Sequence, residues 1–325
     1  MDALSLALLL AALCSSPLYL LMMHLLIRNK NGEFGSAFWK FSVSLGFADI
    51  ISIAINILDG LIKCGLLDPR TLSALPSWTY QLWLQLEMIG MNSQFLGVLA
   101  ITANRYTALC WPTHHKMVWT APRVLLVVFG QWLIPILAAT PMFRSEYSMV
   151  LSNRSRTSYY LKIENRELRD IYWYGFSGFC GLLNLLVIVS YTCMLLSLCR
   201  RPAMPRRRAW EQIRRRDAKL ALSGFVIASM MFVHNMCFIR IALDPAFSPP
   251  NEKFLMALLT VVRGVFGWCN PWVLIVTSST LQKQLGQLVC CVKWNLAGGE
   301  YTATTGLSDR NNNDNCLVAL KQVDQ

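Results

Sequence analysis

Apolar residues form seven long runs along the chain, separated by shorter polar or basic segments. Crossing the hydrocarbon layer of a membrane, about 30 Å thick, takes about 20 residues of α-helix, and each run is long enough. The expected spans are Ala3–Ile27, Phe38–Ile62, Trp78–Cys110, Val124–Phe143, Ile171–Cys199, Ala218–Ala242 and Phe254–Thr277. This pattern predicts an all-α fold, a bundle of seven transmembrane helices.

The composition agrees with this interpretation. The chain is 54% hydrophobic and 15% charged, with a mean hydropathy of +0.41, which is typical of a protein that crosses the membrane several times. The first apolar run follows the acidic Asp2 and is too long for the core of a signal peptide. We therefore expect it to remain as the first membrane helix.

The basic residues predict the orientation. Eight arginines lie between the fifth and sixth spans: Arg200, Arg201, Arg206, Arg207, Arg208, Arg214, Arg215 and Arg216. Positive loops stay in the cytosol, which places the N-terminus outside. The loop 144–170 is also basic, but it contains a glycosylation triplet at Asn153, and such sites are modified only on the lumenal side. We expect a multi-pass plasma-membrane protein with an extracellular N-terminus.

Polar residues of the third span follow one face of the helix. Glu87 and Arg105 are five whole turns apart, about 27 Å along the axis, and Gln94 lies close to the same line. An ionisable group at membrane depth needs water or a partner. The stripe indicates either a functional site or polar contacts that join helices.

Other spans repeat the seven-residue spacing. The repeats are Ser42, Asp49 and Asn56 in the second span, Ser177, Asn184 and Tyr191 in the fifth, and Arg263 and Asn270 in the seventh. These faces predict a polar, partly hydrated bundle centre, where the Asp49 carboxylate must find donors, a cation or a proton. Asp59 and Lys63, near the outer end of the second span, are expected to form a solvated rim.

The sequence shows no catalytic pattern. There is no nucleophile beside a base, no phosphate-binding glycine loop, and no metal-ligand spacing of cysteine and histidine, so we expect neither an enzyme nor a metal centre. The segment Leu281–Val292 is amphipathic and ends in Cys290 and Cys291, which predicts a short eighth helix with palmitoylation sites. Residues 1–292 are expected to form one seven-helix membrane domain that includes the amphipathic helix, and 293–325 a disordered cytoplasmic tail.

Several motifs together resemble one family. They are Asn104-Arg105-Tyr106 closing the third span, Pro112, Asp49, Trp132, and Asn270-Pro271 in the seventh span. In this order and spacing, the chain resembles rhodopsin-like G-protein-coupled receptors over roughly residues 1–292. The amino-acid sequences of residues 104–112 and of Pro17-Leu18-Tyr19-Leu20 resemble those of the nematode chemosensory serpentine receptors, nearest to class V or a related class.

The resemblance implies roles for these residues. Arg105, flanked by Asn104 and Tyr106, would contact the G protein, and Asp49 with Asn270 and Pro271 would form a central polar network able to hold sodium. Pro112 and Tyr191 would belong to the same activation region, and Glu87 falls where amine receptors carry their ligand-binding acid. The chain departs from the family's pattern at four places: Tyr80 replaces the usual cysteine, Asn104 the acid, Leu274 the tyrosine, and the sixth span lacks Cys-Trp-x-Pro.

These observations lead to one main hypothesis, a chemosensory receptor that binds a small molecule or short peptide inside the bundle and activates a heterotrimeric G protein. The candidate ligand-binding residues are Glu87, Met91, Gln94, Asn184, His234 and Arg263. Glu87 and Arg263 are expected to form an ion pair across the pocket, unless Arg263 binds an acidic ligand directly. Arg105 is expected to pair with Asp217 in the resting state.

Two other classes of protein remain open. A seven-helix ligand-gated channel would have its N-terminus inside, and a membrane transporter would need a charged pathway across the bilayer. The expected partners are the ligand, the G protein and the lipid bilayer, with no nucleic acid.

Overall fold

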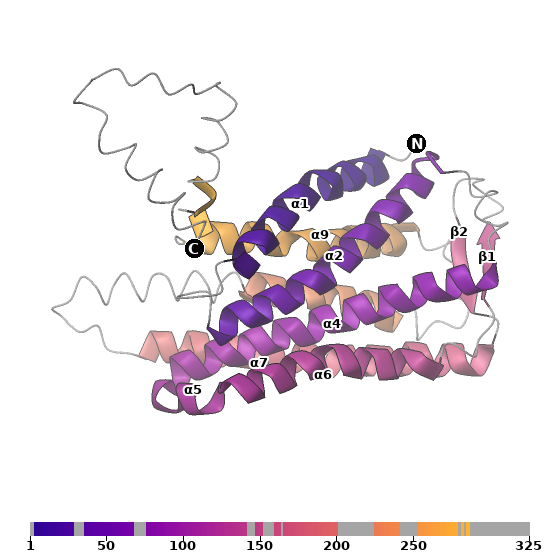
Figure 1. Ribbon diagram of the computed structural model, residues 1–325. Coiled ribbons are helices and arrows are strands. Elements are labelled where there is room, and N and C mark those ends of the chain that lie inside the picture. Colours follow the sequence, from indigo (N-terminus) through magenta and orange to yellow (C-terminus); the bar gives the residue numbers. More distant parts are fainter. Residues whose placement is uncertain are drawn as a thin grey trace, which may run out of the picture. The chain divides into compact units, whose positions relative to one another are not determined.

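The computed structural model describes residues 3–28, 36–67, 76–141, 147–151, 159–163, 165–200, 224–240, 253–278, 281–282 and 284–286. Within these ranges the chain is almost entirely helical (Figure 1). The helices are α1 (Ala3–Arg28), α2 (Ala37–Lys63), α4 (Ser77–Cys110), α5 (Pro112–Val118), α6 (Ala121–Ala139), α7 (Arg166–Arg200), the Gly224–Arg240 helix and α9 (Lys253–Thr277).

Six of the helices described are long and apolar enough to cross a membrane, and the Gly224–Arg240 helix is shorter. That helix lies inside the predicted sixth span, whose remaining positions are outside the described residues. The all-α prediction is therefore confirmed. The largest boundary differences are in α6, which ends at Ala139 rather than Phe143, and in α7, which begins five residues early at Arg166.

Helix α4 is the central element, since it contacts α2, α6 and α7 along its length and α5 and strand β1 at its ends. Gly97 makes one of these contacts possible. A Cβ atom there would lie 2.7 Å from Nε2 of Gln131 on α6 and 3.1 Å from Leu45 on α2. Small residues allow membrane helices to approach closely, and this glycine sits where three helices meet.

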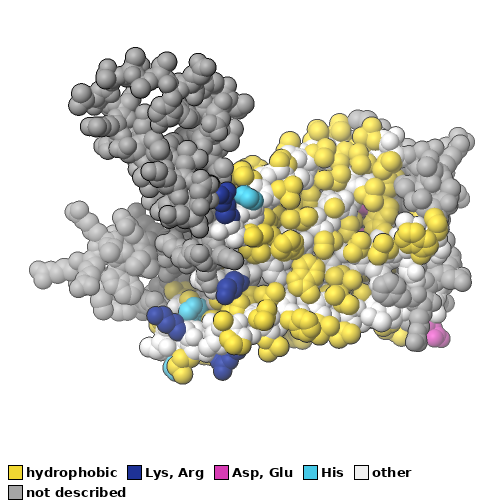
Figure 2. Space-filling model, in the orientation of Figure 1, with side chains coloured by type: hydrophobic (Ala, Val, Ile, Leu, Met, Phe, Trp, Pro, Cys, Tyr) yellow, Lys and Arg dark blue, Asp and Glu magenta, His cyan; other side chains and the backbone are white. Residues whose placement is uncertain are grey.

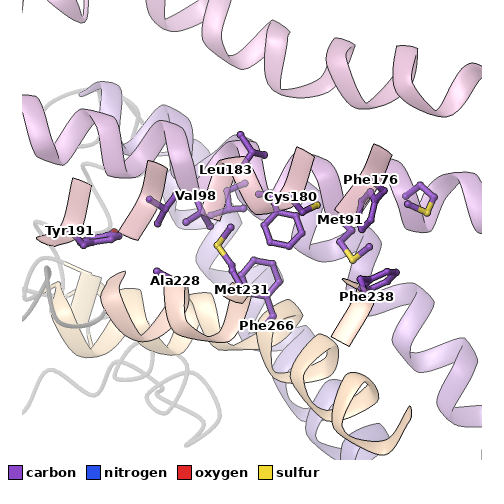
Figure 3. Packing of buried hydrophobic residues seen from close by; sticks show 14 of the residues in the cluster. Met91, Val98, Phe176, Cys180, Leu183, Tyr191, Ala228, Met231, Phe238 and Phe266 are labelled. Atoms are coloured by element: carbon purple, nitrogen blue, oxygen red, sulfur yellow. The ribbon is translucent and has the colours of Figure 1, made fainter. Parts of the chain in front are cut away.

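An apolar core fills the space between α4, α7, the Gly224–Arg240 helix and α9. Figure 3 shows its side chains pointing toward one another from these helices, including Met91, Val98, Leu183, Met231 and Phe266. The ring of Phe266 stacks on that of Phe95, with centroids 5.7 Å apart. The core holds α4 against its neighbours around the polar residues described below.

The outer faces of the helices are apolar as well. On α6 the side chains of Leu125, Leu126, Phe129 and Leu137 are each 58–69% exposed. Figure 2 shows hydrophobic side chains along the flank of the helices, with the Lys, Arg and His side chains that are coloured on this face gathered toward one end. A soluble protein rarely exposes so large an apolar surface, whereas lipid tails would cover it.

The loop between α6 and α7 contains a β-hairpin that the hydropathy pattern did not predict. Strand β1 (Tyr147–Leu151) pairs antiparallel with β2 (Tyr159–Ile163), with Tyr147 opposite Ile163 and Leu151 opposite Tyr159. Both segments are rich in aromatic and aliphatic residues, which favour strands. Backbone pairing joins the two strands, and each of the eight described cysteines is free.

The chain divides into two compact units, Met1–Pro271 and Trp272–Gln325. In the second unit the end of α9 is followed by Ser278, whose Oγ accepts a hydrogen bond from the backbone nitrogen of Leu281 at 3.2 Å. This is the contact of a helix N-cap, and it starts the helical turns at 281–282 and 284–286. The remainder of the predicted eighth helix, with Cys290 and Cys291, and the predicted tail lie outside the described residues.

Gly224 provides a test of this packing. A Cβ atom there would lie 1.9–2.4 Å from the Tyr191 ring and hydroxyl, so Gly224→Ala should displace the ring. We expect overpacking to lower the free energy of unfolding by about 1–3 kcal/mol, measured by thermal unfolding of the purified protein. Gly178→Ala, on the same helix as Tyr191 and with open space around it, is the control and should not destabilise. Equal stability of the two variants would contradict the packing.

Candidate functional site

A cavity lies between α2, α4, the Gly224–Arg240 helix and α9. Its lining residues are Ser52, Ile55, Glu87, Met91, Gln94, His234, Arg263 and Phe266. Five of the six predicted ligand-binding residues are among them. The cavity has an empty volume of about 290 Å³, which includes the space at its opening to solvent. Its interior has room for only about one water molecule. A larger ligand would therefore need side chains to move.

A cluster of charges forms one wall of the cavity. The guanidinium of Arg263 on α9 donates to Oε1 of Glu87 on α4, to Oδ2 of Asp59 on α2 at 3.1 Å, and through Nε to Oδ1 of Asn56 at 3.1 Å. About a fifth of each charged side chain remains exposed, between 20% and 22%. A charge out of water requires such partners, so the cluster joins three helices at one point.

The expected ion pair between Glu87 and Arg263 is thus present in the structure. The expectation for Asp59 was wrong, because this carboxylate binds Arg263 instead of forming a solvated rim. Asp59 lies one turn beyond Asn56, which was already on the polar face of its span. That one-turn spacing was the signal that could have placed Asp59 in the site.

His234 lies deep in the same cavity and is only 3% exposed. Its ring packs against Phe238 and Phe95, with centroids 4.8 and 5.9 Å away. Neither ring nitrogen has a hydrogen-bond partner among the described residues. An unsatisfied buried polar group is costly, so a polar ligand that binds these nitrogens would gain affinity.

Asn184 is the one predicted ligand-binding residue that does not line the cavity. Its side-chain amide donates to the backbone oxygen of Met231 at 3.2 Å, and the residue is 2% exposed. The bond joins α7 to the Gly224–Arg240 helix. Asn184 therefore connects two helices and does not face the cavity.

Next to the cavity lies a hydrogen-bond network around Asp49, which is completely buried. Gln94 donates to Oδ1 at 2.6 Å and Asn270 donates to Oδ2 at 2.9 Å. The hydroxyl of Tyr19 on α1 also donates to Oδ2. Gln94 belongs to both groups, since it lines the cavity and binds Asp49. Tyr19 was missed because its partner lies 30 positions away and no spacing in the sequence relates the two.

The predicted coupling residues lie at the C-terminal end of α4. The guanidinium of Arg105 lies over the ring of Phe38 on α2, 4.6 Å from its centroid, which is a cation–π contact. Tyr106 packs edge-on against Trp111, with ring centroids 5.5 Å apart. Asn104 is buried, and Nδ2 of its side chain has no hydrogen-bond partner among the described residues.

A short hydrogen-bond network fixes α5 against this end of α4. Pro112 begins α5, and Oγ1 of Thr107 lies 2.7 Å from Nε1 of Trp119 and 3.0 Å from Nδ1 of His115. Partial burial lowers the pKa of His115 below its ordinary value. The neutral imidazole is therefore the form favoured in this network.

Four predicted site residues lie outside the described part of the chain: Asp217, Asn153, Cys290 and Cys291. Their proposed roles, in resting-state pairing, glycosylation and palmitoylation, stay predictions.

The chain is similar to known receptors over most of its length. A family model described as "Serpentine type 7TM GPCR chemoreceptor Srv" matches residues 8–291. The Caenorhabditis elegans protein "Serpentine receptor class V-1" is 24% identical over 270 residues, which are 80% of this chain and 81% of that protein. "Proteinase-activated receptor 1" of Xenopus laevis is 25% identical over 238 residues, 71% of this chain and 54% of that protein.

The charge cluster can be tested by neutralising its acids. Glu87→Gln or Asp59→Asn alone leaves Arg263 one carboxylate, so each should lower the free energy of unfolding only slightly. The double variant should lower the free energy of unfolding by more than the sum of the two single changes. Removing the partner of a fully buried ion costs about 3–5 kcal/mol, and the loss here should be smaller because a fifth of each side chain is exposed. Thermal unfolding of the purified protein measures all three.

The exposed pair of Arg169 and Asp170, with side chains 37% and 43% exposed, provides the control. Asp170→Asn should change the free energy of unfolding by at most about 1 kcal/mol. If the losses from Glu87→Gln and Asp59→Asn simply add, the two carboxylates do not share one guanidinium.

Proposed function

Because the chain belongs to the Srv family of serpentine seven-transmembrane chemoreceptors, we propose that it binds a small molecule or short peptide in the cavity and activates a heterotrimeric G protein. Membership establishes a receptor that crosses the membrane several times. It also confirms that the chain is not an enzyme, because the family is one of chemoreceptors. Which ligand it binds, and how it signals, are the proposal.

The observation that carries the proposal is a cavity between membrane helices whose largely apolar lining includes a few polar side chains. Glu87, Arg263 and His234 place charged and hydrogen-bonding groups beside the apolar side chains of Met91 and Phe266. Sites for small molecules typically combine an apolar wall with a few converging polar groups. The narrow centre favours a small ligand, or the end of a short peptide.

A path of contacts supports signal transmission to the other end of the bundle. Gln94 faces the ligand cavity and binds Asp49, which in turn binds Asn270 on α9. Arg105 lies on the same face of α4, eleven residues after Gln94, or about 16 Å along the axis. A ligand that binds one arrangement of these helices more tightly would shift the population toward it.

We propose a plasma-membrane location with the N-terminus outside, which puts the arginine-rich segment 200–217 and α5 in the cytosol. Glycosylation of Asn153 would support this orientation. Endoglycosidase should increase the electrophoretic mobility of the wild-type protein and leave Asn153→Gln unchanged. Modification of an acceptor triplet introduced into segment 200–217 would contradict it.

Ligand-evoked signalling tests the proposed function. Cells expressing the receptor with a promiscuous G protein should respond to an agonist found by screening small molecules. Arg105→Ala should abolish the response at unchanged surface expression, and Met91→Trp should raise the half-maximal agonist concentration at least tenfold by filling the cavity. An exposed site away from the cavity, Leu137→Trp on α6, is the control. A ligand-evoked current that needs no G protein would favour the channel alternative.

The contact between Arg105 and Phe38 gives a second prediction. Phe38→Leu keeps an apolar side chain but removes the ring face, so it weakens the resting position of the guanidinium by about 0.5–1 kcal/mol. Ligand-independent signalling should rise about two- to fivefold. Phe38→Tyr keeps a ring and should signal like wild type. An unchanged baseline in Phe38→Leu would show that this ring does not hold the resting state.

A further inference from the structure

We propose that the carboxylate of Asp49 is held by three hydrogen-bond donors in place of a sodium ion, and that Tyr19 of the first helix completes this set. The family resemblance implies a central network able to hold sodium, but the residues present do not fit the ion. This inference goes beyond the proposed function, because it concerns the receptor without any ligand.

The contacts of Asp49 come from three other helices. Tyr19 of α1 and Asn270 of α9 donate to Oδ2, and Gln94 of α4 donates to Oδ1. Each is a polar hydrogen directed at a carboxylate, and hydrogen bonds to a charged acceptor are about twice as strong as neutral ones. Each oxygen therefore accepts at least one hydrogen bond, and three of the about four acceptor positions of the carboxylate are filled.

As these groups lie, the distances leave no room for a cation between them. The amide nitrogens of Gln94 and Asn270 lie 2.6 and 2.9 Å from the carboxylate oxygens. A hard cation binds oxygen ligands at about 2.0–2.6 Å from each, which would push facing groups further apart than this. A cation also binds oxygens, whereas the groups turned toward Asp49 are two N–H donors and one O–H donor.

A glycine on α2 lets α1 pack closely beside Asp49. Gly46 lies three residues before Asp49, on the same face of α2. A Cβ atom on Gly46 would lie 3.4 Å from Cε1 of Tyr19 and closer still, 2.3 Å, to Sδ of Met23. The missing side chain thus leaves space for Met23, one turn after Tyr19 on α1, and lets this part of α1 pack closely on α2. Tyr19 itself is only 1% exposed.

Tyr19 is consequently a positioning residue that ties α1 into the network. A sodium ion would make the resting state depend on the salt outside the cell. Three fixed donors give the buried carboxylate the same hydrogen bonds at any sodium concentration. The resting stability of this receptor should therefore be independent of sodium.

The first experiment compares thermal unfolding of the full-length purified receptor in NaCl and in KCl at equal ionic strength. The two midpoints should agree within about 1 °C. A sodium site filled at ten times its Kd would raise the midpoint in NaCl by about 2–4 °C. A sodium-specific rise that Asp49→Asn removes would overturn the proposal.

The second experiment is a double-mutant cycle on Tyr19→Phe and Asp49→Asn. The hydroxyl of Tyr19 donates to the Asp49 carboxylate, so the double variant should lower the midpoint by less than the sum of the two single changes. Tyr191→Phe, a buried tyrosine in the α7 core, is the control and should add to Asp49→Asn. Additive losses for Tyr19→Phe would overturn the role of Tyr19.

The two experiments are independent of the proposed function. If Asp49→Asn fails to fold, the salt comparison on the wild-type protein still decides, and a sodium-dependent midpoint still refutes the proposal. A receptor that gives no ligand response can pass both tests. A receptor that signals normally can fail both.

Discussion

A charged side chain between membrane helices must be paired inside the bundle, and this constraint organises the whole structure. Burying an unpaired ion costs several kcal/mol, whereas one with matched partners is tolerated. Arg263 meets Glu87 and Asp59, and Asp49 meets three donors. Because the partners come from different helices, each pairing also fixes how those helices pack.

Helix α4 connects the two polar groups. It carries Glu87 in the charge cluster, Gln94 between the cavity and Asp49, and Arg105 near its end. Its other face packs tightly on α6 through Gly97. A helix that is fixed on one side and polar on the other is suited to sense a ligand, since the polar contacts can change while the packing is kept.

The fold could be predicted largely from hydropathy, because a membrane span has a characteristic length and composition. Seven-residue polar spacing also predicted much of the site, since it shows which side chains share a face. It could not show which helices are neighbours. Tyr19 was therefore missed, as was the role of Asp59, because both depend on contacts between distant parts of the sequence.

Two further features were not predicted correctly from the sequence, each for a different physical reason. The hairpin of β1 and β2 lies in a polar loop, where five-residue strands give too weak a pattern to be recognised. Asn184 shared the expected inward spacing, but it bonds to the backbone of Met231 and does not line the cavity. Spacing predicts the face of a helix, while the depth and partner of a side chain depend on packing.

A density map of the ligand-free receptor in a lipid bilayer tests the internal pairing most directly. The guanidinium of Arg263 should lie between the carboxylates of Glu87 and Asp59, with Tyr19, Gln94 and Asn270 in direct contact with Asp49. A map in which Arg263 extends toward the membrane surface and the two acids lie apart would contradict the pairing on which the proposed site depends.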